Sequence, residues 1–410
     1  MRKRKPDHAD NYHDRETEII AYLYYRGLKE HNIATLLGCS IGKVGNRLAE
    51  ARRKRLLVEE RHFHRSRMAD SDRFVELERL DYSILVGEKL KKENSRFHQF
   101  TVLDSGGTGE SPQAIDVRLQ ELAQRLAPLL NSLLLKRSSK IGVSWGTTLG
   151  AAIEALRPEP GHSVAKTHHL FFVPICGEPW GAPHREKSSS YLAGQLDQYI
   201  NHGQGHFLSL AGVPAVIPLR FHNKQGDHKV IRHFFQEATA FGEIFGRESD
   251  TSAKSCNQAP MVETLDTILT SVGAVDKPWR MCGRKLCETG GIPEQRFSDL
   301  VLGDLAGVLI PRNEATAKAS DYQRIEAAWT GIRRCHLEKI AKHASPNGSP
   351  GVVVIAIGHN KAKLLHTVIR QGLVNQVFCD EDLAKTMAAL CGVQVSAQAV
   401  SEYLRKTLAT

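Results

Sequence analysis

The sequence predicts an α/β protein in which an N-terminal winged or helix-turn-helix domain precedes a larger domain built on a mostly parallel β-sheet. Three observations support this fold class. Residues 30–57 hold two short apolar helix patterns separated by a glycine turn. From about residue 99, strand-like apolar runs alternate with helix patterns, as in parallel sheets covered by helices. The length of 410 residues, with 41% apolar residues, is enough for two or more domains with buried cores.

The predicted helix-turn-helix has its characteristic residues in the expected order. The stretch Ile33–Leu37 is apolar at helical spacing, and Gly38 permits the left-handed turn that joins two helices. Ser40 is a suitable N-cap for the second helix, whose apolar stripe runs through Val44–Ala51. Such a second helix enters the major groove while its flanks meet phosphates. The residues that we expect to contact DNA are Ser40, Lys43, Asn46, Arg47, Arg52 and Arg53.

The positive charge of the chain is concentrated in this N-terminal region. Residues 1–68 contain 16 Lys and Arg and 9 Asp and Glu, which is seven of the ten net positive charges of the whole chain. The remaining residues are close to neutral. A basic head on a near-neutral body indicates that the head alone meets a polyanion such as DNA.

Composition and pattern divide the chain into four parts. The first helix is expected at Arg15–Arg26, and a helix that carries dimer contacts is expected at Phe74–Lys92. The predicted parts are a disordered basic tail (1–14), a helix-turn-helix DNA-binding domain (15–62), a linker with an oligomerisation helix (63–95) and an effector-binding domain (96–410).

The alternating pattern in the last part defines its elements in order. Strands are predicted at Phe100–Leu103, Ile141–Trp145, Leu170–Ile175, Phe207–Leu210, Thr267–Val272, Val352–Ile357 and Gln376–Cys379. Helices are predicted at Ala114–Leu135, Thr148–Leu156, Ser190–Tyr199, Val230–Phe245, Tyr322–His343, Lys361–Gln371 and Asp382–Leu390. In such sheets, ligands bind where strands end and helices begin.

Several classes of protein are excluded by the sequence. No run of 18 apolar residues is present, and the basic start lacks the apolar core of a secretory signal. The eight cysteines are scattered without paired spacing, which indicates reduced thiols in the cytoplasm. No motif for a metal ion, a cofactor or a catalytic nucleophile is present, so none of these is expected.

Two strand ends have features of an anion site. At Gly146, Thr147 and Thr148, a turn opens a helix whose free N–H groups and hydroxyls suit a phosphate, although the same residues also form an ordinary N-cap. Lys361 lies at the start of another helix, where a cation is unfavourable unless an anion shares the site. The open alternative for Lys361 is a solvent-facing side chain.

Other candidates lie at further strand ends. Gly177 ends a strand, and Ser188–Ser190 precedes a helix that points at the same rim. Gly273 with Ala274 follows a strand, and Asp304 lies between glycines, where it can accept hydrogen bonds from ligand hydroxyls or act only as a turn residue.

Taken together, these motifs resemble the SorC family of bacterial sugar-responsive transcriptional regulators, which is grouped with the DeoR-like regulators. The resemblance covers nearly the whole chain. Its segments are residues 23–28, Ile33-Ala34, Leu37-Gly38, Val44 with Leu48 and Ala51, Ser144–Leu149, Gly303–Gly307, Gly358–Lys361 and Gly372–Asp380.

The resemblance implies a Rossmann-like effector domain of the sugar-phosphate isomerase and deaminase type. It implies that Gly146, Thr147 and Thr148 cradle the effector phosphate and that Lys361 supplies the counter-charge. It also implies that Gly273, Ala274 and Asp304 face the sugar and that Ser189 supplies a polar contact. Two positions depart from the family pattern. Arg47 occupies a position that normally faces the core, and Cys176 replaces a basic residue that binds a second phosphate in certain members.

The main prediction is therefore a regulator whose affinity for operator DNA is controlled by a phosphorylated sugar and which acts as a dimer or tetramer. We do not expect it to be an enzyme or to bind a membrane. One alternative is a sugar-phosphate isomerase or deaminase with an accessory DNA-binding head, for which Asp304 is the one candidate general base. Another alternative is a DNA-binding scaffold whose pocket binds nothing.

Overall fold

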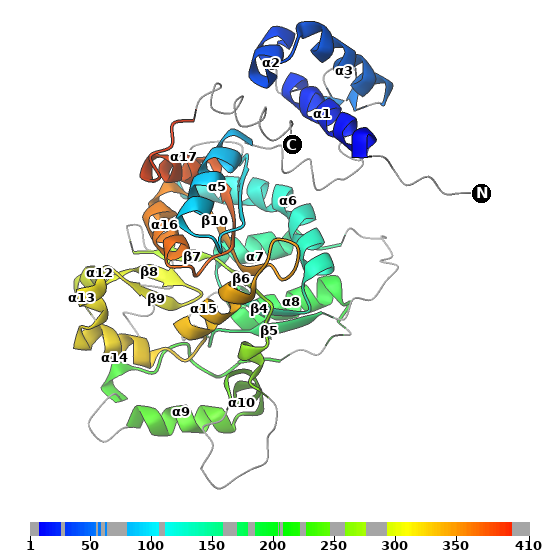
Figure 1. The fold of residues 1–410 in the computed structure, drawn as a ribbon. Coiled ribbons are helices and arrows are strands. Elements are labelled where there is room, and N and C mark those ends of the chain that lie inside the picture. The colour runs from blue at the N-terminus through cyan, green and yellow to red at the C-terminus, as the bar shows by residue number, and fades with distance from the viewer. Residues whose placement is uncertain are drawn as a thin grey trace.

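A computed structural model describes residues 8–25, 29–54, 56–58, 62–63, 80–105, 111–158, 170–178, 185–203, 205, 208–221, 227–246, 259–275 and 293–395. Figure 1 shows a small N-terminal head beside a larger α/β body. The described ordered elements confirm the predicted fold class.

The head is a helix-turn-helix with a two-stranded wing. Its elements are α1 (His8–Tyr25), α2 (Glu30–Leu37), α3 (Ile41–Arg53), β1 (Leu57–Val58) and β2 (His62–Phe63). Gly38 has a φ of 62°, which is the predicted left-handed turn, and Ser40 caps α3 by accepting the Lys43 N–H at 3.2 Å. Helix α1 begins at His8, inside the stretch that the sequence predicted to be disordered. Residues 1–7 lie outside the described part of the chain.

Helix α5 (Leu80–Glu93) connects the head to the body. Ile84 and Leu85 pack against the apolar core of the head, while Val86 and Leu90 are buried in the core of the body. The predicted helix over Phe74–Lys92 is confirmed from residue 80 onward, and residues 74–79 lie outside the described part. Its expected dimer contacts stay a prediction.

The body is built on a six-stranded sheet in which all described pairs are parallel. The strand order is β3-β11-β10-β6-β4-β5. The bounds are Gln99–Leu103 for β3, Lys140–Val143 for β4, Phe171–Pro174 for β5, Thr267–Thr270 for β6, Gly351–Ala356 for β10 and Gln376–Asp380 for β11.

Helices cover both faces of this sheet. One face packs against α6 (Pro112–Arg137), α7 (Thr147–Glu154) and α8 (Ser189–Ile200). The other face packs against α5, α15 (Arg334–His343), α16 (Ala362–Arg370) and α17 (Glu381–Leu390). Since both faces are covered, the strands are buried throughout, which explains their continuous apolar runs.

The connections leave the neighbouring strands β4 and β6 in opposite directions. From β4 the chain moves outward to the edge strand β5, whereas from β6 it moves the other way to β10 and β11. Such a switch point opens a crevice at the carboxyl ends of the two strands, where ligands bind in open α/β sheets. The predicted site residues lie around this point.

A second, antiparallel sheet was not predicted. It consists of β7 (Val272–Ala274), β8 (Val301–Leu305) and β9 (Val308–Pro311). Ala306 and Gly307 join β8 to β9 with φ values of 54° and 80°, the two positive values that a tight hairpin turn of type I′ requires. The glycines of this hairpin predicted a turn. Because they interrupt the apolar pattern, the strands on either side of the turn were not predicted.

Three predicted elements need correction. The described part of the predicted strand Phe207–Leu210 is not a strand, because the Leu210 N–H is taken by the Ser190 hydroxyl at 2.9 Å. The predicted helix Tyr322–His343 is two helices, α14 (Ser320–Ala328) and α15, interrupted by the extended residue Trp329 and by Gly331. Likewise, the predicted helix Val230–Phe245 is divided into α9 (Asp227–Glu237) and α10 (Thr239–Phe245).

The remaining described elements are short. They are the helices α12 (Glu294–Leu300) and α13 (Glu314–Ala317) and the 3₁₀ turns η2 (Arg185–Lys187), η3 (Leu219–Phe221), η4 (Met261–Glu263) and η5 (His359–Lys361). Within the described part of the chain, no helix combines the length and the apolar character that crossing a lipid bilayer requires.

Candidate ligand and DNA sites

The first part of the candidate ligand site is the start of α7, directly after β4. Gly146 has a φ of 125°, and a Cβ atom at this position would lie 3.2 Å from the Ser271 hydroxyl at the end of β6. Among the described residues, no side chain caps α7, so its first-turn N–H groups face outward from the helix end. Thr147 is half-buried and Thr148 is buried in this turn. The geometry suits an anion held by backbone amides.

The second part is formed by β7 and β8, which follow from the same switch point. Gly273 pairs directly with Asp304, and a Cβ atom on Gly273 would collide with the Asp304 carboxylate. The Asp304 carboxylate accepts the Gly307 N–H at 2.9 Å. Ala274 is the next residue on β7 and is half-buried. The structure therefore brings together the three residues that were expected to face the sugar.

Asp304 is an unusual carboxyl group. It is 6% exposed, and burial raises its pKa to about 6, although the Gly307 N–H and the charge of Lys361 act in the opposite direction. Lys361 is half-buried at the start of α16, and η5, which ends with it, packs against β7. The role of Lys361 as the counter-charge of a ligand stays a prediction.

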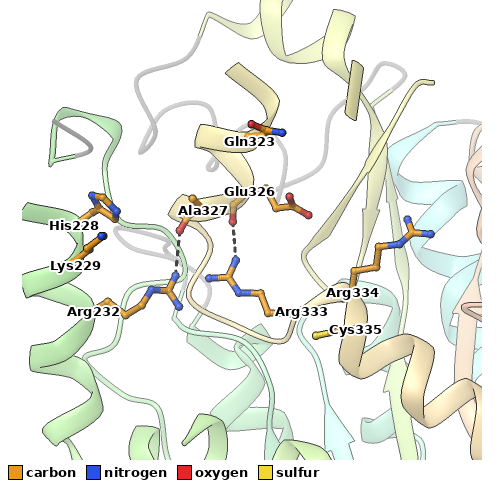
Figure 2. Close-up of a pocket in the computed structure, with 9 residues that line it drawn as sticks. All are labelled: His228, Lys229, Arg232, Gln323, Glu326, Ala327, Arg333, Arg334 and Cys335. Carbon is orange, nitrogen blue, oxygen red and sulfur yellow. Dashed lines mark hydrogen bonds between the residues drawn. The ribbon is translucent and has the colours of Figure 1, made fainter. Parts of the chain in front are cut away.

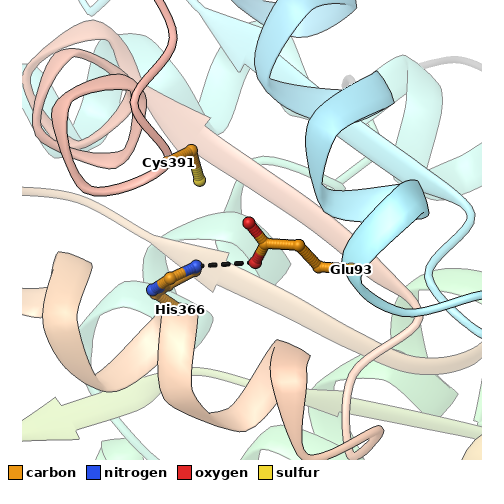
Figure 3. A group of neighbouring side chains, drawn as sticks. All are labelled: Glu93, His366 and Cys391. Atoms are coloured by element: carbon orange, nitrogen blue, oxygen red, sulfur yellow. Dashed lines mark hydrogen bonds and ion pairs between the residues drawn. The ribbon is translucent and has the colours of Figure 1, made fainter.

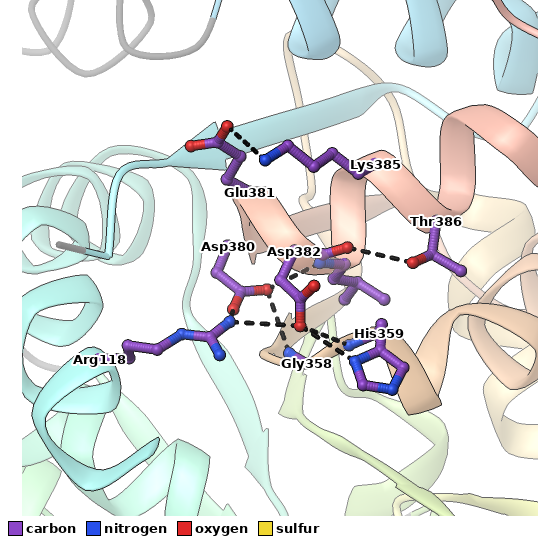
Figure 4. Close-up of polar contacts among 9 residues, drawn as sticks. Arg118, Gly358, His359, Asp380, Glu381, Asp382, Lys385 and Thr386 are labelled. Carbon is purple, nitrogen blue, oxygen red and sulfur yellow. Dashed lines mark hydrogen bonds and ion pairs between the residues drawn. The ribbon is translucent and has the colours of Figure 1, made fainter. Parts of the chain in front are cut away.

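The loop that carries Lys361 is fixed by a buried network that the sequence analysis missed (Figure 4). The Asp380 carboxylate accepts N–H groups from Gly358 and Leu383, both at 3.1 Å. Arg118 of α6 donates to Asp380 from the other side. Asp380 is fully buried, so an intact set of partners is needed to keep its charge there.

Asp382 extends this network to the next residue of the loop. Its carboxylate accepts the His359 N–H at 3.1 Å and lies 3.2 Å from His359 Nδ1. Burial acts to raise the pKa of Asp382, but the hydrogen bonds from His359 and the charge of Arg118 outweigh it, so the pKa is lowered. The one sign of this network in the sequence is that the carboxylate of Asp380 directly follows a predicted buried strand.

The hydroxyl of Ser189, which was expected to contact the ligand, binds the backbone at the ends of two strands. Its hydroxyl is buried, accepts the N–H groups of Ile175 (2.9 Å) and Cys176 (3.3 Å), and donates to the Val143 carbonyl at 2.5 Å. These contacts join the ends of β4 and β5. Gly177 packs tightly, since a Cβ atom there would lie 2.7 Å from the Pro214 carbonyl oxygen. Ser189 and Gly177 therefore fix the position of the backbone at the rim of the site.

Two tryptophans form an apolar wall beside the start of α7. The rings of Trp145 and Trp329 meet edge to face with centroids 5.4 Å apart, and both are buried. Gly307 and Gly331 leave room for the Trp329 ring, because a Cβ atom at either position would collide with it. Trp329 was not predicted, and it connects this site with the end of α14.

On α3, the expected DNA contact Arg47 pairs with two carboxylates of the head, and its contact with DNA stays a prediction. Its guanidinium donates to Glu16 at 3.0 Å and to Glu50 at 2.9 Å, and its side chain is 16% exposed. Lys43 also pairs with Glu16, at 2.5 Å, although 44% of its side chain stays exposed. Burial acts to raise the pKa of Glu50, but hydrogen bonds from Lys54 and Arg47 hold it at about 2. Arg47 therefore points into the head and holds α1 to α3.

The outward face of α3 carries the other predicted DNA residues. Asn46, Arg52 and Arg53 are exposed, and Ile41 at the start of the helix is 54% exposed. Arg52 lies over the Tyr24 ring at 5.8 Å. Ser40 is engaged as the helix cap, so its hydroxyl serves the fold.

One group of metal-ligating side chains lies where α5 meets the body (Figure 3). His366 Nε2 lies 2.8 Å from a Glu93 carboxylate oxygen, and the ligand atoms of both lie within 4.8 Å of the Cys391 thiol. Burial, helped by the charge of Glu93, raises the pKa of Cys391 to about 11. The histidine and glutamate satisfy each other, so we interpret the group as a polar contact between α5 and α16.

Comparison with known proteins places the fold. No protein-family model and no curated protein matches the chain. Its structure is similar to that of the full-length sorbitol operon regulator SorC from Klebsiella pneumoniae, with a TM-score of 0.51 and 17% identity over 92% of this chain and 99% of that chain. It is also similar to a transcriptional regulator from Streptococcus pneumoniae TIGR4, with a TM-score of 0.50 and 15% identity over 75% of this chain and 97% of that chain. The chain therefore shares the fold of these regulators.

Proposed function

We propose that the chain is a transcriptional regulator whose affinity for operator DNA is controlled by a phosphorylated sugar. The observation that carries this proposal is the meeting of three groups at the switch point of the sheet. The turn at Gly146 before α7 lies beside Ser271, which precedes β7, while Asp304 pairs with β7 and the η5 turn that ends at Lys361 packs against it. The fold shared with SorC, a regulator of the sorbitol operon, supports the same assignment.

In the proposed complex, the phosphate binds to the start of α7. Backbone N–H groups of the first turn and the Thr147 hydroxyl donate to it, and Lys361 supplies the opposite charge. Asp304 accepts hydrogen bonds from sugar hydroxyls, and Gly273 has no side chain that would cover the carboxylate. Ser189 and Gly177 act by holding the rim in place.

The DNA contact belongs to the outward face of α3. Asn46 is the best placed side chain for base edges, while Lys43, Arg52 and Arg53 are suited to phosphates. A self-assembled dimer or tetramer, in the cytoplasm, would place two such helices on half-sites about 34 Å apart or a multiple of it.

A continuous path connects the two sites. Lys361 directly precedes α16, and His366 of this helix contacts Glu93 of α5. Ile84 and Leu85 of α5 pack against the head. A ligand that draws Lys361 toward its phosphate moves α16, and α5 transmits the shift to the helix-turn-helix. The ligand controls DNA affinity to the extent that it prefers one of the two arrangements.

The first prediction tests both sites in one assay. DNA that the protein selects from a random duplex pool is expected to bind with a log K that falls by about 0.9 per contacted phosphate for each unit of log salt. Lys361→Met is expected to keep this DNA affinity and to lose the response to the sugar phosphate that shifts the wild-type melting temperature.

Lys363→Met is the matched control, because Lys363 is exposed two residues further along. A salt-independent DNA affinity contradicts the DNA part of the proposal. An equal ligand response in Lys361→Met and Lys363→Met contradicts the ligand part. If no sugar phosphate shifts the melting temperature, a DNA-binding scaffold is the better description.

The enzyme alternative rests on Asp304 alone. A carboxyl group with a pKa of about 6 has the range of a general base. However, isomerisation and deamination usually need a second group that acts as an acid. Incubation of the protein with sugar phosphates and amino-sugar phosphates tests for turnover. Turnover that Asp304→Asn abolishes would replace the regulator proposal by the enzyme.

A further inference from the structure

The first turn of α3 exposes a large apolar side chain to solvent. Ile41 is the first residue of this helix and is 54% exposed. Among the residues of the head whose side chains the structure describes, it is the one large apolar side chain that is exposed. A single exposed isoleucine is common on protein surfaces and by itself indicates nothing. Its significance depends on the residues around it on α3.

The buried residues of α3 fix the side of the helix that faces away from the head. The residues that pack into the head core are Val44, Leu48 and Ala51. Successive residues of an α-helix are rotated by about 100°, so the side opposite to these three carries Gly42 and Asn46. Both residues are exposed, and Ile41 lies beside Gly42 in the first turn.

Gly42 leaves this side of the first turn open. Apart from its own neighbours in the chain and the helix, no described atom would lie within 4 Å of a Cβ atom at this position. Gly45 differs, because a Cβ atom there would lie 3.7 Å from a carboxylate oxygen of Glu30 in α2. Glycine lowers the stability of a helix relative to alanine, and packing within the described head does not require it at residue 42. It does allow another molecule to approach the backbone of α3 closely.

The charge around this surface favours duplex DNA as the molecule that covers it. Lys43 keeps 44% of its side chain exposed, and Arg52 and Arg53 are exposed near the end of the helix. Residues 1–68 carry 16 Lys and Arg against 9 Asp and Glu. An apolar side chain and an amide flanked by cations match the major groove, because base edges lie in the groove and phosphates lie along its sides.

We propose that Ile41 and Asn46 determine the DNA sequence that the head recognises, by contacting a thymine methyl group and an adenine, respectively. This inference rests on the proposed DNA-binding function. The methyl group of thymine is the apolar feature of the base edges in the major groove, and contact with Ile41 removes it from water. The Asn46 carboxamide accepts a hydrogen bond from adenine N6 and donates one to N7, a pattern that no other base presents.

The geometry of the helix predicts the distance between the two contacts. Asn46 follows Ile41 by five residues, which corresponds to about 7.5 Å along the helix axis. Base pairs are stacked about 3.4 Å apart, and a recognition helix lies in the major groove. The thymine and the adenine are therefore expected about two base pairs apart in each half-site. Gly42, on the surface between the two side chains, lets the helix come close enough for both contacts.

The first test uses DNA that the full chain selects from a random duplex pool. Each thymine of the selected half-site is replaced in turn by uracil, which lacks only the methyl group. One replacement is expected to weaken binding by wild type about fourfold, the effect of exposing one apolar carbon group, and to have no effect on Ile41→Ala. Val117→Ala shortens an exposed apolar side chain of α6 and is the matched control, which should keep the fourfold loss.

The second test concerns the adenine and the close approach. Asn46→Ala is expected to lose the preference for adenine at one position, about two base pairs from the thymine, by about tenfold or more. Gly42→Ala is expected to leave α3 at least as stable, as hydrogen exchange of its amides measures, and to weaken binding to the selected DNA. Gly45→Ala makes the same change on the side that faces α2 and should keep the DNA affinity.

The outcomes distinguish this inference from the proposed function. If neither wild type nor any variant binds duplex DNA in a salt-dependent manner, the proposed function fails and this inference fails with it. If wild type binds DNA but every uracil replacement affects wild type and Ile41→Ala equally, Ile41 does not contact a thymine, and only the inference is overturned. A change in the oligomeric state of Ile41→Ala, with an unchanged response to uracil, would assign the side chain to a protein interface instead. Equal DNA affinity of Gly42→Ala and Gly45→Ala would contradict the close approach.

Discussion

At the scale of single residues, Asp304 is the group whose chemistry differs most from its ordinary behaviour. It lies on β8 with its carboxylate over Gly273, accepts the Gly307 N–H, and feels the charge of Lys361. These partners do not fully compensate the loss of water, so its pKa is raised from 3.8 to about 6. A ligand hydroxyl that donates to the carboxylate would supply the missing hydrogen bond.

This shift predicts a pH dependence. Because the folded pKa is the higher one, Asp304 contributes stability that is fully present below about pH 3.8 and is lost as the pH rises through about 6. The melting temperature of wild type should therefore fall relative to that of Asp304→Asn as the pH rises through this window. Its full size is on the order of 3 kcal/mol, since one pKa unit corresponds to about 1.4 kcal/mol. If this difference in melting temperature stays constant from pH 4 to pH 7, burial does not raise the pKa of the Asp304 carboxyl.

At the scale of elements, the head is held together by charge as well as by its apolar core. Glu16 of α1 is 4% exposed and receives both Lys43 and Arg47 from α3. This arrangement explains why an arginine occupies a position that normally faces the core of the motif. It takes the place of an apolar contact between the same two helices.

Removal of the Glu16 charge is predicted to loosen α3. Glu16→Gln leaves Arg47 with Glu50 alone, and breaking a buried pair costs about 3 kcal/mol. Hydrogen exchange of the backbone amides of residues 41–53 should accelerate accordingly. Asp321→Asn breaks the exposed pair with Arg296 and should change little, since surface pairs contribute about 0–1 kcal/mol. Equal exchange in the two variants would remove Glu16 from this role.

At the scale of the whole molecule, α5 is the element through which the body reaches the head. Its first turns pack on the head core and its last turn contacts α16 through Glu93 and His366. The proposed effector site lies at the other end of α16, where Lys361 directly precedes the helix. Helix α16 thus connects the proposed ligand site with α5, through two residues that are 273 positions apart in the sequence.

Breaking this contact is predicted to uncouple the two functions. Glu93→Gln should keep the shift in melting temperature that the sugar phosphate produces and should keep DNA affinity without ligand. The change in DNA affinity on ligand addition should fall, and DNA titrations with and without ligand measure it. Glu88→Gln, which breaks an exposed pair with Lys91 on the same helix, is the control. A normal ligand response in Glu93→Gln would mean that the signal takes another route.

Local patterns in the sequence predict most of the elements and their order. Local spacing predicted the helix-turn-helix with its Gly38 turn and Ser40 cap, all six parallel strands to within two residues of their bounds, and most of the helices between them. Periodicity reveals these features because one face of each helix, and both faces of each strand, are buried by the same rule along the whole element. The strands β7 to β9 were not predicted, because Gly273 and Gly303 interrupt the apolar runs of β7 and β8 and Gly307 places a turn directly before β9.

Which side chains meet depends on how distant segments of the chain pack. The Arg118–Asp380 pair joins residues 262 positions apart, and one cavity gathers side chains of α9, α14 and α15 (Figure 2). Arg47 faces inward because Glu16, on a different helix, compensates its charge. Burial leaves a period along the chain, whereas an ion pair or a cavity depends on how distant segments pack. The residues that form an ion pair or line a cavity therefore share no recognisable local pattern in the sequence.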